Sequence, residues 1–260
     1  MLSKKQQQFV NSLKQKKKRE ALHLFIAEGT KVVTELLNSS IVVKQLFATS
    51  HFLEKTTISA KTEYTEIKAS ELERISLLTS PNEVLAICET PKYNLVKTQL
   101  NSKLTFVLDD IKDPGNLGTI IRIADWFGVE HVICSIETVE AYNPKVVQAT
   151  MGSIARVKIH KLDLIEFFKT ESLTLKIESF GAVLNGENIY SKTLPENGLL
   201  FIGNESRGIS ENLLPYITNK IGIPSFLSFK PINETAESLN AAIATAIICS
   251  EFRRRIKTVE

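Results

Sequence analysis

Three short stretches of the sequence place polar side chains where a ligand could bind. Asn116 and Arg122 follow one apolar run, Glu205 follows another, and Ser238 and Asn240 precede a long apolar helix. In open α/β sheets, ligands bind in the loops at the carboxyl ends of the strands. We therefore expect these three stretches, which are distant in sequence, to meet beside one pocket.

The second stretch, GNESRG at residues 203–208, has a glycine at the end of a predicted strand. A polar loop follows Gly203 before the next helix. Because glycine has no side chain, a ligand can approach the backbone closely there, and the loop amides can point towards it. The position of Gly203 favours a binding loop.

The first two stretches also have a purely structural interpretation. Arg122 and Asp125 could form an exposed ion pair on one face of a helix, worth ~0.2–0.5 kcal/mol, with Asn116 as a turn residue. Glu205 could pair with Arg207 at the surface of a tight turn. Each stretch taken alone is compatible with this interpretation.

The third stretch has the structural interpretation of a helix cap. Either Ser238 or Asn240 could be the N-cap, worth ~0.5–2 kcal/mol. A cap needs only one polar side chain, and burying the second without a partner would cost ~1–3 kcal/mol. The pair is therefore a candidate for function as well as for capping.

Regularly alternating strands and helices carry these stretches. Leu104–Leu108 is predicted to be a buried strand, turn-forming residues follow it, and a helical apolar pattern begins at Thr119. The same reasoning predicts strands at 104–108, 131–134, 157–160, 179–184, 198–203 and 220–224, and helices at 118–127, 144–153, 163–169, 209–217 and 237–255. This alternation predicts an α/β fold with a mostly parallel sheet and helices on both faces. The last helix is apolar nearly all round, so we expect it to be buried against the sheet or another subunit.

A second, smaller domain is predicted ahead of this region. Strands and helices alternate between residues 23 and 89, which is enough for a small α/β/α sandwich, and a polar connector separates them from Leu104. The predicted division is a basic N-terminal helix or arm at residues 1–20, a smaller domain at 21–95 and a larger domain at 96–260.

The N-terminal segment is strongly basic. Residues 1–20 contain seven Lys and Arg residues against a single acidic residue, whereas the whole chain carries a net charge of +3. Such a segment is typical of proteins that bind the phosphate backbone of nucleic acids, although many solvated helices share this composition. Phe9, Val10 and Leu13 form a short apolar stripe that should dock the segment.

Composition and motifs exclude several classes of protein. No apolar run is long enough to span a bilayer and no signal-peptide core is present, so we expect a cytoplasmic protein without membrane contact. The three cysteines have no CxxC spacing and the four histidines no metal-binding spacing, which predicts buried thiols and no metal site. There is no dinucleotide-binding GxGxxG motif and no phosphate-binding P-loop.

Taken together, the motifs resemble those of the SpoU (TrmH) family of RNA ribose 2′-O-methyltransferases in the SPOUT superfamily. The motifs are NLGxxxR at 116–122, GNESRG at 203–208, and IP at 223–224 followed by SLN at 238–240. The FIAEG segment at 25–29 resembles the ribosomal-protein-like substrate-binding domain that often precedes the catalytic domain. The resemblance of the catalytic part covers residues 104–255.

The resemblance implies a fold and a cofactor that periodicity cannot show. Members of the family have a C-terminal trefoil knot, bind S-adenosylmethionine in it and work as homodimers. The implied partner is RNA, with ribosomal RNA favoured by the N-terminal domain and transfer RNA as the other possibility.

The resemblance also implies roles for individual residues. Arg122 matches the family's catalytic arginine, which would bind phosphate and stabilise the developing alkoxide because its guanidinium stays charged. Residues that match those orienting this arginine, the ribose and the cofactor are Asn116, Glu205, Ser238 and Asn240. Residues that match backbone or wall contacts to the cofactor are Gly203, Ile223, Leu239, Ala182 and Val183.

The third motif departs from the family pattern. The family usually has IPM with SLN a few residues later, whereas here Ser225 follows Pro224 and residues 225–237 delay Ser238. The longer loop could cover the cofactor or contact RNA. This departure motivates an alternative hypothesis, a non-catalytic RNA-binding protein on the same scaffold; a third hypothesis is a small-molecule-binding α/β protein with no nucleic-acid role.

Overall fold

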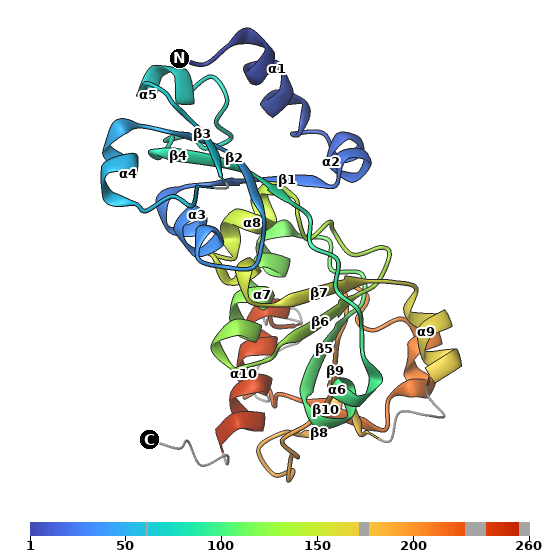
Figure 1. Cartoon of the computed structure of the whole chain (residues 1–260). Coiled ribbons are helices and arrows are strands. Elements are labelled where there is room, and N and C mark those ends of the chain that lie inside the picture. Colours follow the sequence, from blue (N-terminus) through green and yellow to red (C-terminus); the bar gives the residue numbers. More distant parts are fainter. Residues whose placement is uncertain (61, 172–176, 227–237, 255–260) are drawn as a thin grey trace. The chain divides into compact units, whose positions relative to one another are not determined.

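The computed structural model describes residues 1–60, 62–171, 177–226 and 238–254, which fall into two compact units (Figure 1). The first unit contains residues 1–92 and 140–156, and the second contains the rest of the chain. The chain therefore passes between the units three times, and the first unit includes a segment from the middle of the sequence.

The first unit is built on a four-stranded sheet. Its elements are α1 (Lys4–Ser12), α2 (Lys16–Leu22), β1 (Leu24–Glu28), α3 (Thr30–Leu37), β2 (Val43–Ala48), α4 (Ser50–Lys55), β3 (Glu63–Glu66), α5 (Ala69–Leu72), β4 (Val84–Glu89), α8 (Pro144–Ala149) and the 3₁₀ helix η1 (Ser153–Ala155). The strand order is β1-β4-β2-β3, with β4 antiparallel to β1 and β2, and β2 parallel to β3. The apolar residues of β1, β2 and β4 are buried, so this unit has a core of its own.

The basic N-terminal segment is two helices, where the sequence predicted one. Ser3 caps α1 by accepting a hydrogen bond from the backbone N–H of Gln6, and the helix ends at Ser12. Val10 and Leu13 are fully buried and join the core beneath the sheet, whereas Phe9 is 37% exposed. The predicted apolar stripe thus docks the segment through two of its three residues.

Arg19 differs from the other basic residues of this segment because it is buried. Its side chain is 3% exposed and forms a bidentate ion pair with Glu140, with Nε–Oε1 and Nη2–Oε2 distances of 2.9 and 2.5 Å. Its Nη1 also donates to the carbonyl oxygens of Leu13 and Lys14. Arg19 is therefore part of the packing of the first unit and is not available at the surface.

The segment 140–156 is held to the first unit by further contacts. The rings of Phe25 and Tyr142 lie 5.0 Å apart, and Arg156 pairs with Glu35 at the surface. The predicted helix 144–153 is broken here: α8 ends at Ala149, and η1 follows Gly152, which has a φ of +101°. A side chain at position 152 would meet Glu35, so the break lets the backbone pass close to α3.

The second unit contains a six-stranded sheet in which all strands are parallel. Its elements are α6 (Lys97–Ser102), β5 (Leu104–Leu108), α7 (Pro114–Trp126), β6 (His131–Cys134), β7 (Lys158–Lys161), α9 (Leu164–Glu171), β8 (Ser179–Asn188), β9 (Gly198–Ile202), the 3₁₀ helix η2 (Glu211–Tyr216), β10 (Asn219–Gly222) and α10 (Ala241–Arg254). The strand order is β10-β8-β9-β5-β6-β7. The predicted mostly parallel sheet is confirmed.

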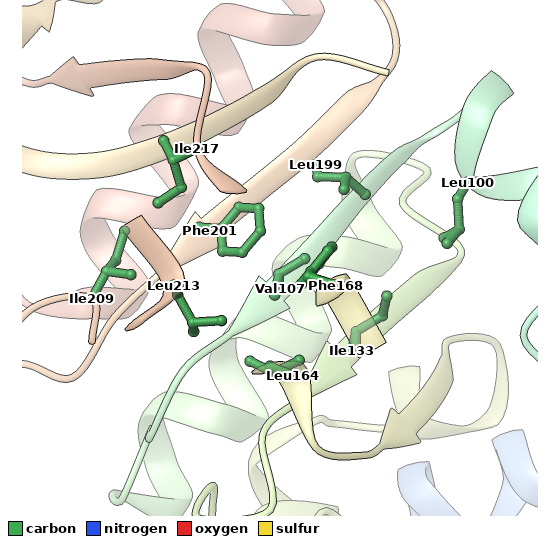
Figure 2. Packing of buried hydrophobic residues seen from close by; sticks show 10 residues of the cluster. All are labelled: Leu100, Val107, Ile133, Leu164, Phe168, Leu199, Phe201, Ile209, Leu213 and Ile217. Atoms are coloured by element: carbon green, nitrogen blue, oxygen red, sulfur yellow. The ribbon is translucent and has the colours of Figure 1, made fainter. Parts of the chain in front are cut away.

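Helices pack on both faces of this sheet, as predicted. On one face, α9 and η2 cover side chains of the central strands, and Figure 2 shows the resulting cluster of Leu100, Val107, Ile133, Leu164, Phe168, Leu199, Phe201, Ile209, Leu213 and Ile217. On the other face, α7 and α10 pack side by side (Figure 1), and Phe180 of β8 meets Phe252 of α10 edge to face. The last helix is buried along one side only, because Ile243 is 52% exposed.

Helix α7 begins four residues earlier than predicted. The residues expected to form a turn, Pro114 to Asn116, are its first turn. Asp113 is the N-cap and accepts a hydrogen bond from the backbone N–H of Asn116 at 2.8 Å. Proline is well tolerated at the first helical position, where its missing N–H has no partner to lose. The prediction of Asn116 as a turn residue was therefore wrong.

A buried pair of histidines joins β6 to β7. His131 and His160 are 0% and 6% exposed, and Nδ1 of His131 lies 3.0 Å from Nε2 of His160. Burial lowers the pKa of His131, and burial together with the charges of His131 and Lys158 lowers the pKa of His160 to about 4. Both rings are therefore neutral at pH 7.

This pair should make the protein acid-sensitive. The unfolded chain protonates His160 near pH 6.5 and the folded chain only near pH 4, so the stabilisation is complete above pH 6.5 and is lost as the pH falls towards 4. We expect the free energy of unfolding to fall by roughly 2–3 kcal/mol more in wild type than in His160→Gln across this range. Urea unfolding at several pH values would measure it, with the exposed His51→Gln as control. Parallel pH curves for wild type and His160→Gln would contradict it.

Candidate active site

The candidate site lies at the carboxyl ends of two neighbouring strands, β5 and β9. Strand order reverses between them, because the chain runs outward from β5 through β6 to β7 and then returns on the side of β9. Loops at such a switch point are where parallel α/β sheets bind ligands. Helix α7 follows β5 and the loop 203–210 follows β9, so their polar residues are close in space.

Asn116, Glu205 and Asn240 are joined by hydrogen bonds. Nδ2 of Asn116 donates to Oε1 of Glu205 at 2.6 Å, and Nδ2 of Asn240 donates to Oδ1 of Asn116 at 2.8 Å. These bonds use both ends of the Asn116 amide and connect residues that are 89 and 124 positions apart in the sequence. The three predicted clusters thus converge on one place.

The orientation of the Asn240 amide is set by the helix that it caps. Its Oδ1 accepts hydrogen bonds from the backbone N–H groups of Ala242 at 2.9 Å and Ile243 at 3.2 Å. Because the oxygen faces α10, the Nδ2 group is directed to Asn116. Asn240 therefore combines the structural and the functional interpretations of the third stretch.

Ser238 lies outside this hydrogen-bonded set. Its side chain is exposed and makes no hydrogen bond with any residue whose structure is described. The expected cost of burying a second polar side chain at the helix start does not arise. The predicted long loop that precedes it lies mostly outside the described residues, at 227–237.

Arg122 is also separate from this set and is exposed. It lies on α7, less than two turns beyond Asn116, and forms no hydrogen bond or ion pair within the described ranges of the chain. The predicted structural alternatives for the first two stretches are not formed: Arg122 has no carboxylate partner there, and Glu205 bonds to Asn116 while Arg207 pairs with Asp110. A guanidinium without an internal partner keeps all its N–H donors for a ligand.

Two residues that sequence reasoning did not assign, Asp109 and Asp110, hold the loop after β9. Both are buried, and their carboxylates contact Ser210 and Arg207 respectively. Their position directly after a mostly apolar strand was visible in the sequence. Two carboxylates at the end of a buried strand need partners, and this requirement was the available signal.

The loop itself requires glycine at its start. A Cβ atom at Gly203 would lie 2.2 Å from the carbonyl carbon of Gly208 and 2.3 Å from the backbone nitrogen of Ile209. Asn204 and Gly208 exchange backbone hydrogen bonds of 3.0 and 2.9 Å, which closes the loop. The sequence suggested that Gly203 would let a ligand approach the backbone closely. In the structure, Gly203 lets the backbone of Gly208 and Ile209 approach it.

Gly203→Ala should displace this loop. Because the contacts are with backbone atoms, the added methyl group is expected to lower the free energy of unfolding by ~1–3 kcal/mol and to weaken any ligand bound at the strand ends. Urea unfolding and calorimetry with S-adenosylmethionine would measure the two effects. Gly128→Ala is the control for ligand affinity: a Cβ there meets nothing within 4 Å, so its φ of +67° makes the substitution lower stability without displacing the loop. Equal ligand affinity in both variants would contradict the expectation.

The residues proposed from the sequence to hold the cofactor have free backbone groups. Among the residues that the structure describes, the N–H and C=O groups of Gly203, Ile223 and Leu239 form no hydrogen bond. Gly203 and Ile223 are half-buried, Leu239 is 48% exposed, and Ala182 and Val183 are half-buried on β8. Free donors and acceptors beside apolar walls suit the adenosine and amino-acid parts of S-adenosylmethionine.

The described part of the chain contains no group of three His, Cys, Asp or Glu side chains that could hold a metal ion, and none of its helices is long and apolar enough to span a membrane. Cys88, Cys134 and Cys249 are free and buried as predicted, and burial raises the pKa of each thiol.

Comparison with known proteins identifies the two parts of the chain. Residues 103–250 match the SpoU rRNA Methylase family, and residues 5–86 match the MRM3-like substrate binding domain. The 23S rRNA (guanosine(2553)-2′-O)-methyltransferase RlmP of Bacillus subtilis is 26% identical over 242 residues, which are 92% of this chain and 92% of that protein.

Two solved structures share nearly the whole fold. A putative RNA methyltransferase of the TrmH family from Porphyromonas gingivalis is 37% identical, with a TM-score of 0.85 over 98% of this chain and 100% of its own. The AdoMet-bound rRNA methyltransferase from Sinorhizobium meliloti is 28% identical, with a TM-score of 0.86 over 99% of this chain and 97% of its own.

These similarities confirm the predicted α/β fold class, which in SpoU methyltransferases carries the trefoil knot. They also confirm the predicted enzyme class, an RNA 2′-O-ribose methyltransferase, and the predicted cofactor, S-adenosylmethionine. With a family match over more than half of its length and a site in which all three motifs meet, this chain belongs to the SpoU rRNA Methylase family.

Proposed function

We propose that this protein transfers the methyl group of S-adenosylmethionine to a ribose 2′-OH of ribosomal RNA. The observation that carries the proposal is the hydrogen-bonded chain Glu205–Asn116–Asn240, to which each of the three family motifs contributes one residue. Its central residue, Asn116, lies on α7, the helix that also carries Arg122. Relatives that match nearly the whole chain are named as 23S rRNA 2′-O-methyltransferase and rRNA methyltransferase, which supports ribosomal RNA as the substrate.

Arg122 is proposed as the catalytic residue. The sulfonium of the bound cofactor supplies an already activated methyl group, so the protein must orient the ribose hydroxyl and help it to lose its proton. An exposed guanidinium that has no partner among the residues the structure describes can bind an RNA phosphate and stabilise negative charge as it develops on the 2′ oxygen. In this arrangement the bound phosphate is the group that accepts the proton.

The remaining predicted residues are proposed to orient these groups. The amide of Asn116 is held between Glu205 and Asn240, which fixes the first turn of α7 at the end of β5. The exposed hydroxyl of Ser238 is available to the ribose or to the cofactor. The backbone groups of Gly203, Ile223 and Leu239 would hold the cofactor, with Ala182 and Val183 as a wall beside the adenine.

The first unit is proposed to bind the RNA. Its match to a substrate binding domain supports this role. The six lysines of residues 1–20 support it too, whereas Arg19 is buried in an ion pair and does not contribute to the basic surface. The predicted division, a basic N-terminal segment at 1–20, an RNA-binding domain at 21–95 and a methyltransferase domain at 96–260, is proposed with one change: residues 140–156 pack with the first unit. Salt-dependent binding of RNA to variants lacking these lysines would test it.

We also propose a cytoplasmic homodimer. Helices α7 and α10, which pack together, leave Trp126 84% exposed and Ile243 52% exposed. Apolar side chains exposed on neighbouring helices are typical of subunit contacts. Light scattering of wild type and Trp126→Lys would test the dimer, and cell fractionation would test the location.

The decisive experiment is methyl transfer to defined RNA. The protein is incubated with labelled S-adenosylmethionine and with ribosomal or transfer RNA from cells that lack it, and 2′-O-methylnucleosides are quantified and mapped. Incorporation into ribosomal RNA at one position is expected. Incorporation into transfer RNA alone would change the proposed substrate, and no incorporation would overturn the proposal. In that case calorimetry with RNA and with S-adenosylmethionine would test the non-catalytic alternative, which expects the protein to bind RNA but not the cofactor.

A further inference from the structure

Two consecutive carboxylates end the central strand β5. Asp109 and Asp110 are 4% and 8% exposed, directly before the helix that carries Asn116. Asp110 has a φ of +58°, in the left-handed region that few residues other than glycine adopt. A buried charge in an uncommon backbone conformation needs a structural cause, and the contacts of the two residues provide it.

Both carboxylates hold the loop that follows β9. Oδ2 of Asp109 accepts hydrogen bonds from the backbone N–H of Ser210 at 2.7 Å and from its Oγ at 2.6 Å. The carbonyl oxygen of Asp110 accepts from Nδ2 of Asn204 at 3.0 Å, and its carboxylate pairs with Arg207. The end of β5 thus holds the beginning, the middle and the end of the loop.

The left-handed conformation lets Asp110 bond to the segments that follow both neighbouring strands, β6 and β9. Its N–H donates to Oγ of Ser135, which follows β6, at 3.0 Å. Its carbonyl oxygen and its Oδ2 face the loop after β9 instead, while its Oδ1 pairs with Lys112, two residues further along the chain, at 2.5 Å. Asp110 therefore connects the ends of three adjacent strands, with β5 in the centre.

Within the loop, Asn204 transmits this attachment to Glu205. Its Nδ2 is bound by Asp110, while its Oδ1 accepts from the backbone N–H groups of Ser206 at 2.9 Å and Arg207 at 3.2 Å. Glu205 lies between these bonded residues, and its carboxylate reaches Asn116. The position of Glu205 is consequently set by a frame attached to β5.

We propose that Asp110 is a positioning residue for Glu205, with Asp109 as the second anchor of the same loop. This inference rests on the proposed methyl transfer. Asp110 acts through Asn204 and Arg207 to keep the Glu205 carboxylate against Asn116. This contact fixes the first turn of α7, and with it the position of Arg122 further along the helix, relative to the loops that would hold the cofactor.

Two substitutions test Asp110 in complementary ways. Asp110→Asn keeps the size and tolerates the left-handed conformation, but removes the charge that faces Arg207 and Lys112. Asp110→Ala also removes the acceptor oxygens. If Asp110 positions Glu205, kcat should fall roughly 10- to 100-fold in Asp110→Ala and less in Asp110→Asn, while the KM for S-adenosylmethionine stays within about threefold.

A double-mutant cycle with Glu205→Gln separates positioning from general stability. If Asp110 acts through Glu205, its substitution should have little further effect on kcat once the Glu205 carboxylate is removed. The kcat of Asp110→Ala,Glu205→Gln should therefore resemble that of the more impaired single variant. Effects that multiply would overturn the proposal. Glu166→Gln is the control, because it removes an exposed carboxylate of α9 that forms no hydrogen bond or ion pair with the loop residues 203–210. If Asp110→Ala does not fold, the same cycle is run with Asp110→Asn and with Arg207→Gln.

Hydrogen exchange gives a readout that does not depend on activity. The amides of Ser206, Arg207 and Gly208 are protected by bonds to Asn204, so Asp110→Asn should increase their exchange rates roughly tenfold or more relative to amides of β5. Unchanged exchange would overturn the proposal. If wild type transfers no methyl group, the proposed function fails by itself, and exchange alone decides whether Asp110 holds the loop.

Discussion

Arg122→Ala is expected to lower the rate of methyl transfer by roughly 10²–10³-fold, because it removes the donor that would face the developing negative charge on the 2′ oxygen. The affinity for S-adenosylmethionine should change little, since the residues proposed to hold the cofactor are on β8 and on the loops after β9 and β10, not on α7. Single-turnover transfer to ribosomal RNA measures the rate, and calorimetry measures the affinity.

Two variants control this experiment. Arg122→Lys keeps the charge but loses the planar arrangement of donors, so it should recover only part of the rate. Arg254→Ala removes an arginine that is 54% exposed and paired with Glu251 on α10, and it should leave the rate unchanged. A protein that is equally active with Ala at position 122 would refute the role proposed for this residue.

Glu140→Ala is expected to destabilise the first unit by about 3–5 kcal/mol, because it leaves the guanidinium of Arg19 buried without its bidentate partner. The carbonyl oxygens of Leu13 and Lys14 accept hydrogen bonds from Arg19 but carry no compensating charge. Hydrogen exchange of the backbone of β1 and β4 would measure the free energy of opening of this unit.

The matched control for Glu140 is Glu35. Its ion pair with Arg156 also joins residues 121 positions apart, but the side chains are 37% and 48% exposed. An exposed pair contributes ~0–1 kcal/mol, so Glu35→Ala should have a small effect. If Glu35→Ala and Glu140→Ala destabilise the first unit equally, burial of Arg19 is not the cause. The single tryptophan, Trp126, reports on the second unit and should be unaffected by either change.

Local features of the chain could be predicted from the sequence with little error. The strands at 104–108 and 131–134 occur as predicted, because a buried strand needs a short, mostly apolar run and the run ends where the strand ends. The start of α7 was predicted wrongly, although its signal was present. Asp113 followed by Pro114 is a helix N-cap and first position, and this signal outweighed the turn-forming character of the residues that follow.

The membership of the site was predicted from motifs, but its organisation was not. The sequence placed Asn116, Glu205 and Asn240 near one pocket; the structure decides that Asn116 is the centre of the chain of hydrogen bonds, and that Asn240 also caps a helix. It leaves Ser238 and Arg122 exposed. Neither residue type nor spacing reveals which of several polar side chains will be hydrogen-bonded to one another.

The sequence by itself determined the two α/β regions, the strands of the parallel sheet and the family, because these follow from apolar periodicity and short motifs within a few tens of residues. Only the tertiary structure decided that residues 140–156 pack with the first unit, that Arg19 is buried against Glu140, and that Asp109 and Asp110 hold the loop around Glu205. The physical reason is that these contacts join residues about 100 or more positions apart. Their formation depends on which strands become neighbours in a sheet, and strand order cannot be inferred from local patterns of hydrophobicity.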